Sequence, residues 1–146
     1  MDISGHNPEK DERDHRAPVT EITAEQCWEH LYSARFGGIA TMDGDEIEIT
    51  PINPVADDEK IYFRTAQGTK LLHLVLREQV TVQVDHVQGG EAWSVIARGT
   101  AGQLSDPAET TRVDELFLRP WLEATKFEYV QVTPTKVTGH HFHLGH

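Results

Sequence analysis

Two segments of this chain alternate strictly between apolar and polar residues, and this alternation restricts the possible folds most strongly. Glu46–Thr50 carries isoleucine at every second position, and Gln79–Val87 carries three valines with the same spacing. A period of two is that of a β-strand whose faces meet different surroundings. Asp43–Asp45 and Gln88–Gly90 contain turn signals, and hairpin turns join antiparallel strands. Because no repeated strand–helix alternation follows, a parallel doubly wound sheet is not expected.

The number of such segments indicates a mostly β domain with peripheral helices. We expect six or seven strands in hairpin order, with two or three helices as insertions. The longest expected strand, Glu91–Leu104, contains Gly99 and Gly102, where a bend or bulge is expected. Glycine bends on long strands favour a closed barrel, so the sequence predicts a six- to seven-stranded antiparallel β-barrel. The last strands are expected at Phe127–Thr133 and Lys136–Leu144.

Three segments carry helix signals. Thr23 and Gln26 fit a capping box that opens a helix, which is expected to end near Phe36. Asp106 suits the N-cap position and Pro107 the first helical position of another helix. The remaining helix is expected at residues 69–77, and the one after Pro107 is expected to run to about residue 118.

The chain has 146 residues, which suggests one domain with a real core. Residues 1–20 are poor in apolar side chains and rich in charge, so we expect a disordered or loosely attached N-terminal arm. Residues 21–146 then form a single domain.

Charge and cysteine content exclude several classes of function. The net charge of −11 argues against nucleic acid and against an anionic membrane surface. No segment approaches 18 apolar residues, and the N-terminus has no apolar signal core, so a cytoplasmic protein is expected. Cys27 is the single cysteine, which rules out an internal disulfide and indicates a small buried residue.

Residues 61–72 suggest an anion site. They read as a strand, a glycine turn and the start of a helix, with Lys70 in the first turn, where the helix dipole disfavours a cation. Arg64 ends the strand and is expected to converge with Lys70 on the same spot. Two cations with a threonine hydroxyl and backbone N–H groups suit a phosphate monoester. We therefore expect a phosphate-bearing ligand at residues 64–71; the alternative is a solvated basic surface.

The order of these segments resembles the pyridoxamine 5′-phosphate oxidase-like family, the FMN-binding split barrels. The resemblance covers about residues 22–142 and is closest to the small, mostly uncharacterised members of the family. It rests on six segments: Phe36–Thr41, Ile49–Val55, Ile61–Lys70, Val80–Asp85, Trp93–Gly99 and Val137–His141.

The resemblance implies a split-barrel homodimer with FMN in each groove between the subunits. Trp93 would approach the flavin from the partner subunit, although a half-buried structural aromatic is an equal alternative. The implied phosphate contacts are Arg64, Thr65, Thr69, Lys70 and Leu71, and the implied ring contacts are Thr50, Pro51, Ile52, Asn53 and Phe63.

The family resemblance also implies a function. His140 and His141 stand where the family often has arginines, and the substrate signature of the vitamin-metabolising oxidases is missing, so pyridoxamine phosphate oxidation is not expected. We expect an FMN-dependent oxidoreductase that acts on a small molecule or takes electrons from a nicotinamide nucleotide. No side chain need act as acid or base, because the cofactor carries the chemistry. The alternatives are a non-catalytic flavin-binding module, an F420- or haem-binding split barrel, and a cofactor-free dimer.

The C-terminus is dense in histidine. His141 and His143 would share one face of a strand and offer a metal or haem ligand pair. A polar terminus is the simpler interpretation, because no carboxylate or cysteine lies at a fixed spacing nearby. No metal site is therefore predicted.

Overall fold

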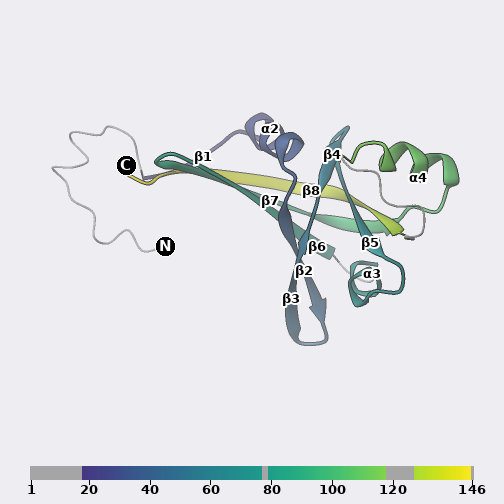
Figure 1. The fold of residues 1–146 in the computed structure, drawn as a ribbon. Helices are drawn as coiled ribbons and strands as arrows, with labels where there is room; N and C mark the ends of the chain where they lie inside the picture. Colours follow the sequence, from purple (N-terminus) through teal and green to yellow (C-terminus); the bar gives the residue numbers. More distant parts are fainter. Residues whose placement is uncertain (1–17, 77–78, 118–126, 146) are drawn as a thin grey trace.

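The chain forms one antiparallel sheet with three helices on its surfaces (Figure 1). The computed structural model describes residues 18–76, 79–117 and 127–145. The sheet has eight strands in the order β3-β2-β6-β7-β8-β5-β4, with β1 also paired to β8. Its strands are β1 (Val19–Glu21), β2 (Gly37–Asp43), β3 (Glu46–Ile52), β4 (Val55–Asp57), β5 (Lys60–Ala66), β6 (Gln79–Gln88), β7 (Glu91–Gln103) and β8 (Phe127–His143). The helices are α2 (Ala24–Ser33), α3 (Lys70–Val75) and α4 (Pro107–Asp114).

The mostly β, antiparallel architecture predicted from the alternation is confirmed. The sheet has eight strands where six or seven were expected. The excess comes from the two short strands β1 and β4, which have three residues each. In the described part of the chain β3 and β4 are the ends of the strand order, so hydrogen bonds do not close the barrel. Every described pairing is antiparallel, as the hairpin turns predicted.

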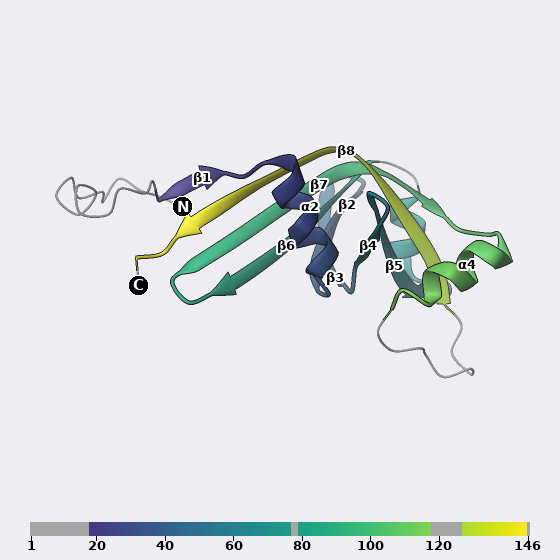
Figure 2. The ribbon, with the colours of Figure 1, turned by 90° about the horizontal axis from the view of Figure 1, so that it is seen from above.

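The long strands β7 and β8 arch across the whole molecule (Figure 2). β8 is one continuous strand of 17 residues where the sequence predicted two. The pairing of β7 with β8 shifts register between Arg98 and Gly99, as expected for a bulge at this glycine. A Cβ on Gly99 would overlap the backbone of Thr133 and Pro134, so the close approach of the strands requires glycine. The bulge lets β8 bend at Pro134 and continue instead of ending.

The N-terminal strand begins inside the segment expected to be a loose arm. Val19 and Thr20 pair with Phe142 and His141 of β8. The ordered part of the domain therefore starts before residue 21, and residues 1–17 lie outside the described residues.

The capping box of α2 is confirmed. The Thr23 hydroxyl accepts a hydrogen bond from the backbone N–H of Gln26 at 3.1 Å, and the Gln26 side chain accepts one from the backbone of Thr23 at 2.9 Å. The helix ends at Ser33, three residues before Phe36, because Ala34 is already extended. Cys27 of this helix is fully buried, and burial raises the pKa of its thiol.

The other helices begin where the sequence predicted them. Thr69 is the N-cap of α3, and Asp106 precedes Pro107 at the start of α4, although its side chain forms no capping hydrogen bond. α4 ends at Asp114, earlier than expected, and the predicted helix ends at residues 77 and 118 lie outside the described residues. None of the helices in the described ranges has the length and apolarity to cross a membrane.

β5 is buried on both faces and separates two hydrophobic clusters. Phe63 belongs to the main cluster, together with Ile39, Val82 and Val130. The neighbouring Tyr62 belongs to a second cluster beside α4. Adjacent residues of a strand point to opposite faces, so alternate side chains of β5 face different clusters. The same alternation determines on which face of β5 each polar side chain lies.

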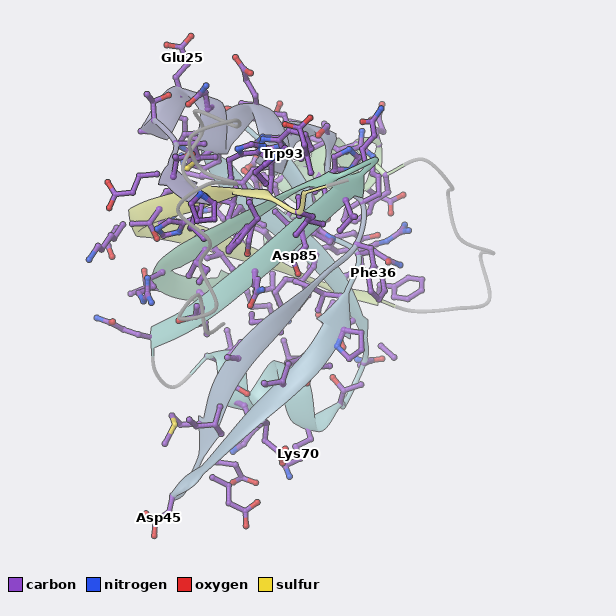
Figure 3. The ribbon with its side chains drawn as sticks, turned by 90° about the vertical axis from the view of Figure 1, so that its left-hand side faces the viewer. Glu25, Phe36, Asp45, Lys70, Asp85 and Trp93 are labelled. Carbon is purple, nitrogen blue, oxygen red and sulfur yellow. The ribbon has the colours of Figure 1, made fainter. Side chains whose placement is uncertain are left out.

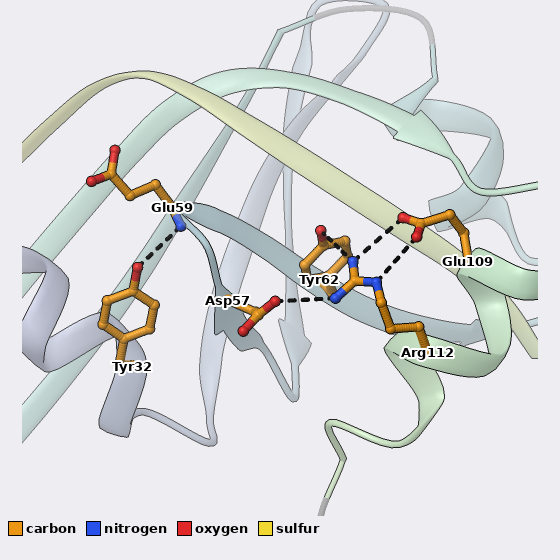
Figure 4. Close-up of polar contacts among 6 residues, drawn as sticks. All are labelled: Tyr32, Asp57, Glu59, Tyr62, Glu109 and Arg112. Atoms are coloured by element: carbon orange, nitrogen blue, oxygen red, sulfur yellow. Dashed lines mark hydrogen bonds and ion pairs between the residues drawn. The ribbon is translucent and has the colours of Figure 1, made fainter.

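Polar contacts fasten α2 and α4 to the β4–β5 turn (Figure 4). The Arg112 guanidinium of α4 lies 3.1 Å from Asp57 and donates to the Tyr62 hydroxyl at 3.2 Å. The backbone N–H of Glu59 donates to the Tyr32 hydroxyl of α2 at 3.0 Å. These bonds hold both helices against the segment that leads into the predicted anion site.

Candidate functional site

Thr65, Thr69 and Lys70 come together at the end of β5. The hydroxyl oxygens of Thr65 and Thr69 are 2.9 Å apart and share a hydrogen bond. Gly68 between them has a φ of +78°, a left-handed conformation that favours glycine and makes the tight turn possible. The sequence motif therefore forms a compact turn with two hydroxyls and one ammonium group.

Lys70 projects from α3 toward the β2–β3 hairpin (Figure 3). Its ammonium nitrogen lies 2.8 Å from Asp43 and 3.0 Å from Glu48. The hydrogen bonds that the ammonium donates to these two carboxylates, first of all Asp43, raise the pKa of Lys70 above its usual range. The lysine side chain is 63% exposed, so water and salt weaken both ion pairs. These two partners lie more than 20 residues away in the sequence, and the motif gave no sign of them.

The side chain of Arg64 does not join Lys70. It follows Tyr62 to the other face of β5, where it is only 9% exposed and lies 2.8 Å from Asp114 of α4. Its guanidinium also lies 4.2 Å above the ring of Phe117 and 5.2 Å from that of Phe127. The two cations that the sequence was expected to bring together therefore lie apart, Arg64 against α4 and Lys70 beside the β2–β3 hairpin.

Asp114 accepts hydrogen bonds from two side chains on this face of β5. The same carboxylate oxygen that meets Arg64 accepts a hydrogen bond from the Tyr129 hydroxyl at 2.6 Å. Burial, followed by the hydrogen bond to Asp114, raises the pKa of Tyr129 to about 12. Sequence reasoning identified neither Asp114 nor Tyr129, because each lies tens of residues from Arg64.

The β3 segment proposed to pass along the flavin ring lies at the sheet edge. Ile52 is buried, whereas Pro51 and Asn53 are exposed. Thr50 pairs with the buried Ile39, so it faces inward, on the same side as Glu48. Proline is tolerated here because an edge strand leaves one row of hydrogen-bonding groups unpaired.

The outward face of β3 is apolar, which is unusual for an exposed edge. Ile47 and Ile49 are 67% and 76% exposed, and Phe36, just before β2, is 66% exposed. A groove of about 310 Å³ runs along this face. Its lining is Phe36, Gly37, Gly38, Ala40, Ile49, Thr81, Gln83 and Asp85. An apolar face of this kind on an isolated chain is typical of an interaction surface.

Trp93 lies in a different part of the molecule from Lys70, near the top of Figure 3. It stands directly opposite His86 on β6 and His141 on β8. His30 of α2 lies over the same indole, at 5.4 Å between ring centres. Burial, and then the charge of His86, lower the pKa of His30.

A second cavity of about 240 Å³ adjoins this aromatic cluster. It is lined by His30, Ser33, Ala34, Arg35, Phe36, Val84, Asp85, His86 and Trp93. Phe36 and Asp85 also line the groove along β2 and β3, so the two hollows share a border.

The C-terminal histidines belong to the sheet. His141 lies 2.8 Å from Glu91 and packs against Trp93. Within residues 18–76, 79–117 and 127–145, no group of three or more His, Cys, Asp or Glu side chains is arranged to hold a metal ion.

The chain is similar over most of its length to proteins of one family. The family model described as pyridoxamine 5′-phosphate oxidase matches residues 23–141. A Corynebacterium glutamicum structure, provisionally named as a pyridoxamine 5′-phosphate oxidase, is 36% identical with a TM-score of 0.79, covering 90% of this chain and 98% of its own. A structure of an FAD-binding protein from Mycobacterium smegmatis is 36% identical with a TM-score of 0.78, covering 86% of this chain and all of its own.

A curated relative agrees with the structural matches. An uncharacterised Mycobacterium tuberculosis protein is 35% identical over 85 residues, which is 58% of this chain and 77% of that protein. The family model spans α2, every strand from β2 to β7 and most of β8, and therefore includes both regions described above. The chain belongs to the pyridoxamine 5′-phosphate oxidase family, and its fold is the split barrel of that family.

Proposed function

We propose that this protein binds a flavin through the turn that joins β5 to α3 and uses it to oxidise or reduce a small molecule. The observation that carries the proposal is the pair of hydroxyls of Thr65 and Thr69 beside Lys70, in a chain of this family. Hydroxyl and ammonium donors suit phosphate oxygens, so these residues fit the phosphate of a flavin nucleotide. The proposal assigns the phosphate to these residues and not to the Arg64 side chain, because Asp114 and two aromatic rings engage it.

The flavin ring is proposed to lie along the edge strand β3. Thr50 faces the same side as Glu48, which reaches Lys70, so phosphate and ring contacts are available on one side of the hairpin. Pro51, Ile52 and Asn53 continue the same strand end, and Phe63 and Leu71 belong to the apolar packing behind it. A bound flavin supplies the hydride or electron chemistry, while these residues bind it and fix its position.

A second copy of the chain is proposed to complete the site. Trp93 is separated from Lys70 within one chain, so an indole contact to the same flavin must come from a partner. The exposed row of Phe36, Ile47 and Ile49 supports such an association, because apolar groups of this size are normally covered. The proposed assembly is a homodimer with a cofactor at the subunit interface.

FMN is the cofactor expected from the sequence, and FAD is a second candidate because the Mycobacterium smegmatis relative is named for binding FAD. F420 and haem are the alternatives for a barrel that takes no flavin. The proposed electron donor is a nicotinamide nucleotide. A flavin-binding module without catalysis is the alternative to an enzyme.

The test begins with the visible spectrum of the purified protein, followed by fluorescence titration with FMN, FAD and riboflavin. Saturable quenching of flavin fluorescence supports the proposal, and the absence of binding by all three contradicts it. Oxidation of NADH or NADPH with an acceptor by the flavin-loaded protein then separates an oxidoreductase from a binding module. Size-exclusion chromatography with light scattering tests the dimer.

A further inference from the structure

We propose that Asp43 and Glu48 act as a carboxylate gate on Lys70, which weakens the binding of phosphate-bearing flavins relative to riboflavin. This inference rests on the proposed flavin site and identifies the residues that limit its affinity for phosphate. Both carboxylates come from the β2–β3 hairpin, and both reach the same ammonium nitrogen.

The gate follows from competition for one cation. A lysine ammonium has three N–H donors, and Asp43 and Glu48 already engage it at 2.8 and 3.0 Å. A phosphate that approaches Lys70 must displace a carboxylate or share the ammonium with it. In either arrangement two like charges face the incoming anion, and like charges repel in proportion to their product.

The number of charges on the phosphate decides how strongly the gate acts. A phosphate monoester carries about −1.5 to −2 charge at pH 7, because its second pKa is about 6. Each phosphate of a diphosphate diester keeps only one ionisable oxygen, so the two phosphates of FAD together carry about −2. The carboxylates therefore oppose FMN and FAD to a similar degree and have no phosphate to repel in riboflavin.

The gate is weak enough to respond to ligand. The side chains of Lys70, Asp43 and Glu48 are 63%, 44% and 39% exposed, so solvent screens their ion pairs. The Thr65 and Thr69 hydroxyls share one hydrogen bond, so one hydroxyl proton of the pair remains as a neutral donor for either flavin. The carboxylates therefore tune affinity without blocking the site.

The test compares charge-neutralised variants with three ligands. Asp43→Asn and Glu48→Gln are titrated with FMN, FAD and riboflavin by fluorescence quenching, with Glu46→Gln as the matched control on the same hairpin. Each of the first two variants is expected to tighten FMN binding by about two- to fivefold. FAD binding should tighten by a similar factor, and riboflavin, which has no phosphate, should be unchanged. Glu46→Gln should leave all three affinities unchanged, since the ion pairs of Lys70 are with Asp43 and Glu48.

Three results overturn the gate. These are unchanged FMN affinity in both variants, an equal gain for riboflavin, and an equal gain in Glu46→Gln, which would indicate general charge repulsion. If these proteins bind flavin but show one of those results, only the gate fails. If none of them binds any flavin, the proposed function fails with it. Thermal unfolding of each variant confirms that the compared proteins are folded.

Discussion

Arg64 and Lys70 look alike in the sequence but occupy very different places in the fold. Both are cations of one strand–turn–helix motif, and both meet carboxylates at about the same distance. Arg64 is 9% exposed between α4 and β8, whereas Lys70 is 63% exposed beside a hairpin. The first is fixed within the fold, and the second is available to a ligand.

The difference teaches that burial, more than residue type, separates a structural charge from a binding charge. Removing one partner of a buried ion pair leaves the other charge buried and unpaired. When an exposed pair is broken, water solvates the remaining charge. We therefore expect Arg64 to control stability and Lys70 to control affinity.

The largest effect is expected from Arg64→Ala. It removes the partner of Asp114 and the stacking on Phe117, and should lower the free energy of unfolding by about 3 kcal/mol. This is the lower end of the range for buried pairs, because the Asp114 side chain is 33% exposed. Urea unfolding followed by circular dichroism measures the change. Lys70→Ala is the control, and an equally large loss in that variant would remove the distinction between the two cations.

Lys70→Ala is expected to reduce affinity instead. Loss of the ammonium should weaken FMN binding about tenfold, the scale of one charge-assisted hydrogen bond, and leave riboflavin binding unchanged. Fluorescence titration of both ligands checks this. Equal weakening for riboflavin would place the lysine away from the phosphate.

Alkaline pH should test the Tyr129 hydroxyl in the Arg64 region when the wild type is compared with Tyr129→Phe. The pKa of Tyr129 is raised from 10 to about 12, so the folded protein keeps the hydroxyl proton that the unfolded chain loses. The stabilisation is complete below pH 10 and is lost as the pH rises from 10 through about 12. We expect the free energy of unfolding to fall over this window, and to fall less in Tyr129→Phe. Urea unfolding at several alkaline pH values measures it, and identical pH curves would show that Tyr129 does not contribute.

The smallest effect is expected when the partners of Lys70 are neutralised. Asp43→Asn and Glu48→Gln should shift Tm by no more than about 2 °C, because exposed pairs contribute little to stability. Calorimetry at low and high salt checks this. A larger shift that disappears at high salt would mean that the hairpin pairs help to hold the fold.

Much of the local structure was predictable. The Thr23–Gln26 capping box, the start of a helix near Thr69 and the bulge at Gly99 depend on residues that are close in sequence or on glycine geometry. The predicted strand break before Lys136 was wrong, because the bulge at Gly99 accommodates Pro134 within a continuous β8. Nothing in the local sequence shows that a distant strand offers such a bulge.

The candidate site was predictable in its motif but not in its partners. Thr65, Thr69 and Lys70 are neighbours along the chain, so their proximity follows from a strand, a turn and a helix start. Asp114 and Glu48 are 50 and 22 residues from the cations that they meet. No local sequence pattern indicates contacts between residues that are so far apart along the chain.

By itself the sequence determined the antiparallel sheet, the helix starts and the position of the strand–turn–helix motif that we propose binds phosphate, because period, capping and turn chemistry are local properties. The tertiary structure alone decided which cation is buried, which carboxylates meet each cation, and that the apolar residues Ile47 and Ile49 face outward. The physical reason is that a strand offers two faces, and only packing against the other elements selects the one that meets solvent.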